Sequence, residues 1–279
     1  MQIIKEIPQL QQNLKKIKNQ KTALIPTMGA LHEGHISLIQ EAKKHANFII
    51  VSIFVNKTQF NDQQDFRNYP KNHDHDLKAL EKHHVDLVFI PQDQEIYPQN
   101  SNFAIKIHDL DNNLCGKTRP NHFNGVALII TKLFNIIRPN YAIFGQKDYQ
   151  QLQIIKKLTQ DFNFQTTIID APTIRNNNGL ALSSRNQHLT KYQQKLAPLI
   201  YQTLQKIRTQ IIKNPQNIKQ TLEKHHLTLT KSGFDKIDYL TICNQETLQE
   251  ITWYNQKIKT RIFIAIYLGK TRLIDNIAI

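Results

Sequence analysis

The feature of this sequence that most constrains its fold is a series of short, almost wholly apolar segments separated by helical patterns. The segments that predict buried strands are 22–27, 48–55, 85–90, 141–144 and 166–170. Helical patterns cover residues 34–46, 125–137 and 148–160. Apolar strands that alternate with helices favour a parallel sheet covered on both faces. We therefore predict an α/β fold with a Rossmann-like, doubly wound parallel sheet.

A different pattern follows the turn-rich segment 171–190, APTIRNNNGLALSSRNQHLT. Thr190 and Gln193 have the spacing of a capping box, which predicts a long helix from there to about residue 212. A further helix is predicted over 216–230, and two strands over 236–242 and 261–268. We therefore expect two domains: a Rossmann-like domain over residues 1–180 and a smaller C-terminal α/β domain over residues 181–279.

The N-terminal segment has the apolar spacing of an amphipathic helix and lacks the order of a signal peptide. Its apolar stripe consists of Ile3, Ile7, Leu10, Leu14 and Ile17. The longest apolar run, residues 48–55, is far too short to span a bilayer. The two cysteines, Cys115 and Cys243, match no metal-site spacing, and nothing else indicates an oxidising compartment. These features predict a cytoplasmic protein without a membrane partner.

The charge balance is strongly basic, with 36 Lys and Arg residues, 22 Asp and Glu residues and a formal net charge of +14. Such a balance fits either an anionic substrate or nucleic acid. The basic residues are scattered, and no RNA-reading or helix-turn-helix signature stands out. We therefore predict no nucleic-acid partner and interpret the excess charge as spread over solvated faces.

The segment 23–39, ALIPTMGALHEGHISLI, leads from a predicted strand through a loop into a helix. In an α/β sheet, ligands bind where the chain leaves the carboxyl end of a strand, and the start of the next helix attracts phosphate. His32 and His35 share a face of that helix, so both rings can reach one ligand atom. Gly34 removes a Cβ between the two histidines, and Gly29 lets the backbone approach that ligand closely. This arrangement predicts a site that stabilises charge developing on the α-phosphate of a nucleotide.

Other interpretations fit the histidine spacing alone. His32 could cap the helix while His35 packs in the turn, or both could bind zinc if a third ligand were present. Residues 73–76, HDHD, also suggest a metal site, but alternate residues of a helix do not share a face. The strand, the glycines and the helix around His32 and His35 favour the nucleotide site.

The segment PTMGALHEGH (26–35) resembles the nucleotide-binding signature of the pantothenate synthetase family, whose members join pantoate to β-alanine. The H-x-G-H element alone is shared with other nucleotidylyl transferases and with class I aminoacyl-tRNA synthetases. Further segments resemble the same family in the same order: VSIFVNKTQF (51–60), RPNHFNGV (119–126), FGQKDYQQ (144–151), GLALSSRN (179–186) and LGKTRLIDNI (268–277). The resemblance therefore covers nearly the whole chain.

The resemblance implies a reaction in two steps. The pantoate carboxylate attacks the α-phosphate of ATP, giving pantoyl adenylate and pyrophosphate, and the amine of β-alanine then displaces AMP. It also implies Mg²⁺ as cofactor, a nucleotide- and pantoate-binding N-terminal domain, a C-terminal domain that closes over ATP, and a homodimer. The substrates are thus expected to be ATP, pantoate and β-alanine.

The resemblance further implies a role for each residue at a matching position. The expected catalytic residues are His35, His32 and Lys147. Contacts to ATP are expected from Met28, Gly29, His32, Gly34, His35, Gly145, Lys147, Asp148, Ile174, Leu182, Ser183, Ser184 and Arg185. Gln59, Gln151, Arg119 and His122 are expected to bind pantoate or β-alanine. Asp76 is expected to bind Mg²⁺ together with the ATP phosphates.

The chain departs from the family pattern at several positions, and these departures affect the expected substrate affinity more than the reaction type. They are Lys57, Lys71, Asn72, Asn121, Asn124, Asn176 and Leu182. Two other function classes stay open: a nucleotidyl transferase with a different acceptor, and a basic RNA-binding module that has kept a synthetase-like fold. Release of AMP with an amide product would separate the ligase from the first, and salt-sensitive RNA binding would identify the second.

Overall fold

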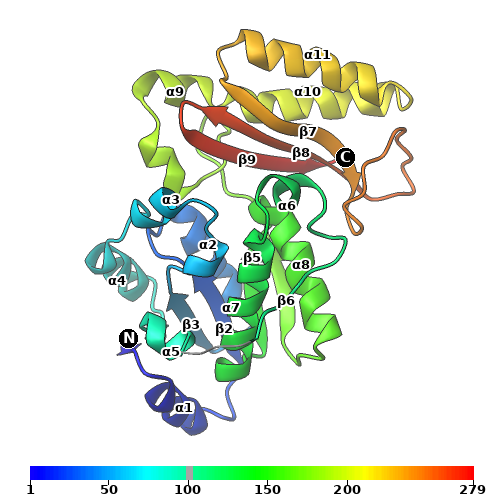
Figure 1. The fold of residues 1–279 in the computed structure, drawn as a ribbon. Helices are drawn as coiled ribbons and strands as arrows, with labels where there is room; N and C mark the ends of the chain where they lie inside the picture. Colours follow the sequence, from blue (N-terminus) through cyan, green and yellow to red (C-terminus); the bar gives the residue numbers. More distant parts are fainter. Residues whose placement is uncertain (99–102) are drawn as a thin grey trace. The chain divides into compact units, whose positions relative to one another are not determined.

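The structure, a computed structural model, describes residues 1–98 and 103–279. The chain forms two compact units (Figure 1). The N-terminal unit comprises Met1–Ile107, Arg119–Gln146 and Gln151–Pro172, and the C-terminal unit comprises His108–Thr118, Lys147–Gln150 and Thr173–Ile279. The chain thus passes between the units several times, whereas the sequence suggested one boundary after residue 180. Among the described residues, no helix is both long and apolar enough to cross a membrane.

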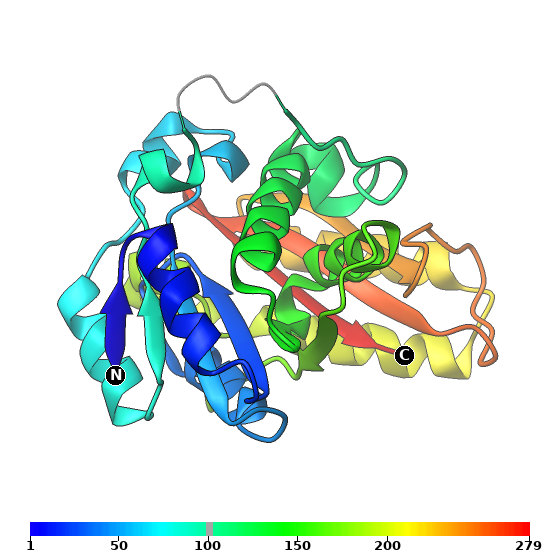
Figure 2. The same cartoon turned by 90° about the horizontal axis from the view of Figure 1, so that it is seen from below.

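Six parallel strands form the sheet of the N-terminal unit, which confirms the predicted doubly wound fold. In spatial order they are β1 (Gln2–Ile4), β4 (Leu87–Phe89), β3 (Phe48–Ile53), β2 (Thr22–Thr27), β5 (Tyr141–Gly145) and β6 (Thr167–Ala171). Figure 2 shows the short β1 beside β4 at one edge. The strand order reverses between β2 and β5, and ligands bind beyond the carboxyl ends of strands at such a switch point.

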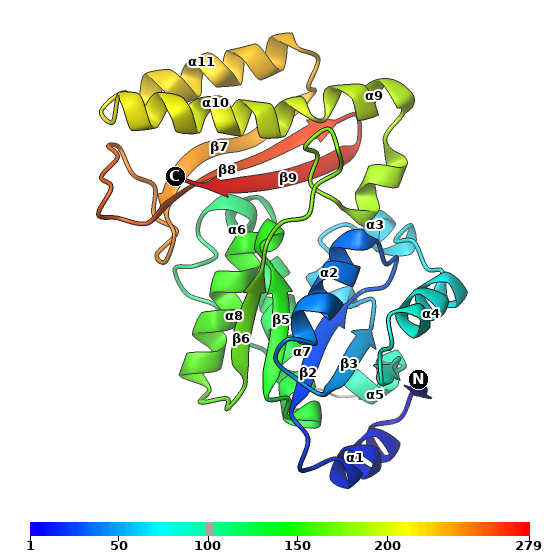
Figure 3. The same ribbon diagram turned by 180° about the vertical axis from the view of Figure 1, so that it is seen from behind.

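Helices flank both faces of this sheet. Figure 3 shows α2 in front of β2, and Figure 1, from the opposite side, shows α7 in front of β5. The helices in chain order are α1 (Ile7–Lys16), α2 (Glu33–Ala42), η1 (Lys57–Gln59), α3 (Gln63–Arg67), α4 (His73–Lys82), α5 (Asp93–Ile96), α7 (His122–Ile137) and α8 (Tyr149–Asp161). Leu24, Ile25 and Ile50 are fully buried, as expected for strands covered on both faces. Ile3, expected in the first helix, lies in β1, because Pro8 favours a helix start at its own turn.

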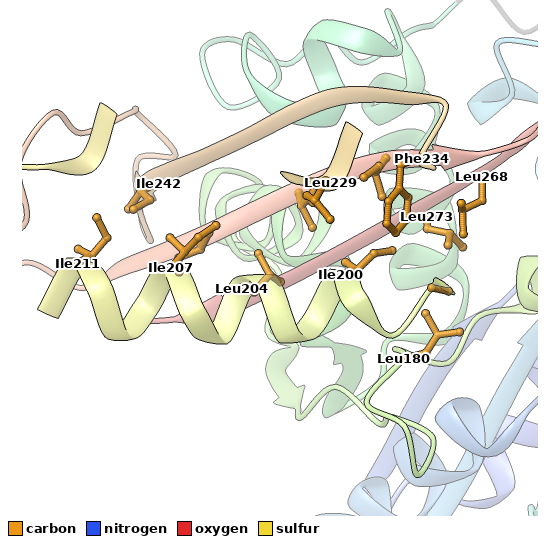
Figure 4. Close-up of a cluster of buried hydrophobic side chains, with 14 of the residues drawn as sticks. Leu180, Ile200, Leu204, Ile207, Ile211, Leu229, Phe234, Ile242, Leu268 and Leu273 are labelled. Carbon is orange, nitrogen blue, oxygen red and sulfur yellow. The ribbon is translucent and has the colours of Figure 1, made fainter. Parts of the chain in front are cut away.

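The C-terminal unit contains a three-stranded antiparallel sheet of β7 (Lys236–Asn244), β8 (Thr260–Leu268) and β9 (Thr271–Ala278). Its helices are α6 (Leu114–Thr118), η3 (Ser184–His188), α9 (Lys191–Leu196), α10 (Leu199–Lys213) and α11 (Ile218–Lys231), and it includes the last two residues of η2 (Gln146–Asp148). One stripe of α10, formed by Ile200, Leu204, Ile207 and Ile211, points toward the strands (Figure 4). This stripe and the inner face of the sheet form the core of the unit.

Two predictions for the C-terminal part were wrong in detail. The capping box of Thr190 and Gln193 is confirmed, but the helix that it opens ends at Leu196 and a second one begins at Leu199. The break falls at Pro198, which has no N–H to continue the helical hydrogen bonds. Strand β9 was not predicted, because its buried polar residues interrupt the apolar pattern. Cys115 and Cys243 are both buried and are not joined to each other.

Candidate active site

The loop between β2 and α2 carries the two histidines at the switch point of the sheet. Gly29 has a φ of +81° and Ala30 a φ of +52°, so the chain turns sharply after the strand. A Cβ on Gly29 would lie 3.0 Å from Oδ2 of Asp76 and 3.2 Å from a methyl carbon of Ile53. Both the positive φ and the tight surroundings therefore require glycine at residue 29. The turn delivers His32 to the N-cap position of α2.

Each of the two imidazole rings is fixed by a hydrogen bond from the backbone at the start of α2. Nδ1 of His32 accepts a hydrogen bond from the N–H of Gly34 over 3.1 Å, and Nδ1 of His35 accepts one from the N–H of His32 over 3.3 Å. The ring centroids lie 4.2 Å apart. Because both Nδ1 atoms accept, each neutral ring carries its proton on Nε2. The pair thus presents two N–H donors beside a helix N-terminus, where an anion is favoured. The capping role and the nucleotide role are compatible in this geometry.

Asp76 lies in the first turn of α4 and is 1% exposed. Its Oδ2 accepts from the N–H of Ala30 over 2.9 Å and its Oδ1 from the N–H of Leu31 over 2.8 Å. Mg²⁺ requires nearly octahedral access to its ligands and usually keeps several waters. A buried carboxylate with both oxygens bound to the backbone does not fit a direct ligand of this ion. Within residues 1–98 and 103–279, no group of three or more His, Cys, Asp and Glu side chains could hold a metal ion.

The side chain of Gln59 is fixed by buried Asn56. Nδ2 of Asn56 donates to Oε1 of Gln59 over 3.0 Å and to the main-chain oxygen of Gly125 over 3.0 Å, while Oδ1 of Asn56 accepts from Oη of Tyr97 over 2.7 Å. The amide orientation of Gln59 follows, since its oxygen accepts and its Nε2 donates to Sδ of Met28 over 3.3 Å. The amide of Gln59 is therefore held in one orientation, with its donor group beside the side chain of Met28. Sequence reasoning missed Asn56, although it lies three residues before Gln59.

Arg119 and His122 contact the backbone of Gln59. The ring Nδ1 of His122 donates to the main-chain oxygen of Gln59 over 2.6 Å, and its Nε2 accepts from Nη1 of Arg119 over 3.0 Å. Gly125 lies where α7 meets η1, and a Cβ there would clash with the main-chain oxygen of Thr58. The segment 119–126 thus holds the loop that carries Gln59. The expected binding of substrate by Arg119 and His122 stays a prediction.

Lys147 and Asp148 lie in η2, within the C-terminal unit. Nζ of Lys147 is 3.7 Å from Oδ1 of Asp148. The main-chain oxygen of Lys147 accepts a hydrogen bond from Nδ2 of Asn276 over 2.9 Å. Oδ1 of Asn276 in turn accepts from Arg261, whose guanidinium lies 4.0 Å from the ring centroid of Tyr149. Strands β8 and β9 therefore hold the short segment 147–150, which explains why it belongs to this unit. Gly145 and half-buried Gln151 flank it in the N-terminal unit.

The remaining expected ATP contacts lie on a hairpin-like segment of the C-terminal unit. The N–H of Leu182 donates to the oxygen of Ile174 over 2.9 Å, and the side chain of Asn176 caps the turn by accepting from the N–H groups of residues 178 and 180. Ser183 is the N-cap of η3, and its hydroxyl accepts from the N–H of Arg185 over 3.3 Å. Ser184 and Arg185 are half-buried in η3.

Arg175 anchors this segment to β9. Its guanidinium binds the carboxylate of Asp275 through two hydrogen bonds of 2.5 and 2.8 Å and stacks 3.8 Å from the ring centroid of Tyr201. Burial raises the pKa of Asp275, while the guanidinium of Arg175 acts in the opposite direction. Neither residue was singled out in the sequence, because their partners lie 100 positions apart.

Comparisons with known proteins agree over the whole chain. The sequence model of the pantoate–β-alanine ligase family matches residues 2–278. A pantothenate synthetase of Buchnera aphidicola subsp. Acyrthosiphon pisum (strain APS) is 45% identical, with 99% of this chain and 98% of the relative covered. One of Thermoanaerobacter sp. (strain X514) is 42% identical, with 94% and 92% covered.

Two solved structures have the same fold. The pantothenate synthetase of Thermus thermophilus superposes with a TM-score of 0.91 at 32% identity, and 99% of each chain is covered. The pantoate–β-alanine ligase of Francisella tularensis, described in complex with β,γ-ATP and β-alanine, gives a TM-score of 0.84 at 39% identity, with 100% of this chain and 97% of that chain covered. The chain belongs to the pantoate–β-alanine ligase family.

Proposed function

We propose that this chain condenses pantoate with β-alanine at the expense of ATP, through a pantoyl-adenylate intermediate, and releases pyrophosphate and AMP. A free carboxylate is a poor acyl donor because its leaving group would be oxide, and adenylation supplies a better one. The observation that carries the proposal is the pair of rings at the switch point. His32 and His35 direct their acceptor nitrogens to the backbone and so keep Nε2–H as the donor of each neutral ring.

The two rings would donate to the α-phosphate, where negative charge increases as the pantoate carboxylate attacks. Gln59, oriented by Asn56, would hold pantoate through its amide N–H, and Gln151 would contribute a second neutral partner. Neutral hydrogen bonds suit this task, because a tightly paired cation would reduce the nucleophilicity of the carboxylate. The backbone of Met28 and Gly29 would face the reacting groups.

The C-terminal unit would bind the rest of ATP. Lys147 and Arg185 would carry positive charge to the phosphates, with Arg185 offering a planar set of donors. Ser183, Ser184, Gly145, Asp148, Ile174 and Leu182 complete the expected ATP contacts. Closure of this unit over ATP and assembly as a homodimer belong to the same proposal, and the cytoplasmic location stays a prediction.

Mg²⁺ belongs to the proposed reaction as the ion that neutralises the triphosphate. The phosphate oxygens and water would supply its ligands, as is usual for this ion in nucleotide-dependent enzymes. The carboxylate of Asp76 would not be among these ligands, because both of its oxygens accept hydrogen bonds from the backbone.

The test measures AMP and pantothenate formed from ATP, Mg²⁺, pantoate and β-alanine, with each component omitted in turn. The proposal expects both products when all four components are present and neither amide nor AMP in quantity when pantoate is left out. Pantoate-dependent exchange of labelled pyrophosphate into ATP, without β-alanine, would identify the adenylation half alone. A folded protein that binds ATP but yields no AMP with these substrates would direct the search to another acceptor.

A further inference from the structure

Two successive backbone N–H groups in the loop before His32 converge on one carboxylate. They belong to Ala30 and Leu31, and they donate to the two oxygens of Asp76 over 2.9 and 2.8 Å. Consecutive N–H groups that follow a left-handed residue form an anion-binding concavity in many proteins. In this chain the concavity is filled by a side chain of the protein itself, 46 residues further along the sequence.

The surroundings of Asp76 suit a carboxylate. The residue lies in the first turn of α4, whose N-terminus attracts negative charge, and Asn72 caps the same helix through the N–H of His75. The ring of His75 lies 3.8 Å from Oδ1 but is largely exposed. The carboxylate is therefore held mainly by backbone dipoles from the loop and from its own helix.

The loop needs such a partner because its backbone is strained. Ala30 has a φ of +52°, which costs energy for a residue with a Cβ, and Gly29 before it has a φ of +81°. Loss of the carboxylate would leave two N–H groups without their acceptor and would let the turn relax. The tight approach of Oδ2 to the position of a Cβ on Gly29 shows that carboxylate and turn are fitted to each other.

The position of this turn determines where both histidine rings lie. His32 follows Leu31 directly, and its backbone N–H donates to Nδ1 of His35 while its backbone oxygen accepts from the N–H of His35 over 2.7 Å. A shift at residues 30 and 31 would therefore move the Nε2 atoms of both rings. Displacements of about 1 Å at a reacting centre can cost roughly 100-fold in rate.

We propose that Asp76 is a positioning residue for adenylation: it fixes the backbone of Ala30 and Leu31, and through them the two histidines, and it does not ligate Mg²⁺. This inference rests on the proposed function, because the rate that it controls is that of the adenylation step. It replaces the metal role that the resemblance implied for this residue.

The test compares Asp76→Asn with Asp74→Asn in the full chain. Both changes remove one negative charge from the first turn of α4, but Asp74 is exposed. Pyrophosphate exchange is measured over a titration of Mg²⁺, with the folded fraction of each variant measured by circular dichroism. We expect kcat per folded molecule of Asp76→Asn to fall roughly 100-fold, with the half-saturating Mg²⁺ concentration unchanged. Asp74→Asn should match the wild type.

The outcomes separate the alternatives. A large increase in the half-saturating Mg²⁺ concentration, with kcat restored at high Mg²⁺, would make Asp76 a metal ligand and overturn the proposal. An unchanged kcat per folded molecule would also overturn it and leave only a stabilising role. Should Asp76→Asn not fold, hydrogen exchange in the wild type decides: protected amides of Ala30 and Leu31 support the positioning role, and rapid exchange refutes it. Hydrogen exchange at these amides is measured without substrate. A failure of the proposed function would instead appear as an inactive wild type, so the two failures are distinguishable.

Discussion

The side-chain amide of Asn276 donates a hydrogen bond to the main-chain oxygen of Lys147 over 2.9 Å. The same amide accepts from Arg261 through its Oδ1, so one asparagine on β9 links a buried arginine of β8 to the segment with the expected phosphate-binding lysine. The position of Lys147 in the C-terminal unit therefore depends on a residue near the end of the chain. The sequence motif around Lys147 contains no trace of this contact.

Asn276→Asp should impair the use of ATP. An aspartate keeps the acceptor for Arg261 but cannot donate to the oxygen of Lys147, and a lost partner of this kind costs about 1–3 kcal/mol. We expect KM for ATP to rise about tenfold, with KM for pantoate little changed, in steady-state assays of AMP release. Asn255→Asp is the matched control, because Asn255 contacts the N–H of Lys257 through Oδ1, which aspartate retains. Equal effects of the two variants would refute the positioning of Lys147 by Asn276.

Gly125→Ala should weaken the binding of pantoate. Alanine normally stabilises a helix relative to glycine by up to about 1 kcal/mol. Here the added Cβ would clash with the main-chain oxygen of Thr58 and push η1, with Gln59, away from α7. We expect KM for pantoate to rise about tenfold or more, while KM for ATP changes little. Asn135→Ala, at an exposed position of the same helix and away from η1, is the control: it introduces alanine and removes only a hydrogen bond to the main-chain oxygen of Thr131. A more stable Gly125→Ala protein with normal KM would contradict the role of this contact.

His35→Ala should reduce the adenylation rate by about two to three powers of ten, the usual loss when a charge-stabilising donor is removed. The fold should persist, because His35 is half-buried and its ring accepts one backbone hydrogen bond at the start of α2. Single-turnover measurement of pyrophosphate release checks the rate, and thermal unfolding checks the fold. An undiminished rate in the folded variant would exclude His35 from the chemistry.

The parts of the fold that the sequence predicted are those that local periodicity encodes. The strand over 22–27 and the helix that follows it are apolar patterns complete within themselves, and the switch point follows from their order in a parallel sheet. Strand β9 was not predicted, because the buried polar residues Asp275 and Asn276 interrupt its apolar pattern. Their burial is tolerated because Arg175, 100 residues away, binds Asp275, and Arg261, on the neighbouring strand β8, binds Asn276. A single stretch of sequence cannot show such a partner.

The candidate site divides in the same way. His32 and His35 could be found from the spacing of a motif, and the helix N-terminus gave that spacing a physical meaning. The positioning roles of Asp76 and Asn56 could not be found, because Asp76 reaches the histidine loop from another helix and Asn56 acts through Gln59, Thr58, Tyr97 and Gly125. Residues expected to touch the reacting groups thus lie within short motifs, whereas the residues that orient them act through contacts that no motif contains.

The stability of the C-terminal unit should fall as the pH is lowered below about 6.5, in part through His225. Burial lowers the pKa of this histidine, and Lys224 and Lys206 act in the same direction. Its Nε2 donates to Oε1 of Gln210 over 3.1 Å between α11 and α10, an arrangement that the neutral ring satisfies. Because the pKa is lower in the folded state, the histidine of the unfolded chain binds a proton at a higher pH than the histidine of the folded chain. The stabilisation is therefore present above the unfolded pKa and is lost as the pH falls through the folded pKa.

His225→Gln retains an amide donor for Gln210 and removes the titration. We expect its unfolding free energy to depend less on pH than that of the wild type below about pH 6.5, by a fraction of one proton. Urea unfolding at several pH values measures this slope directly. His226→Gln provides the control, because His226 is exposed on the same helix and should leave the slope unchanged. If both variants have the wild-type slope, another group is responsible for the acid sensitivity and the neutral state of His225 contributes nothing to it.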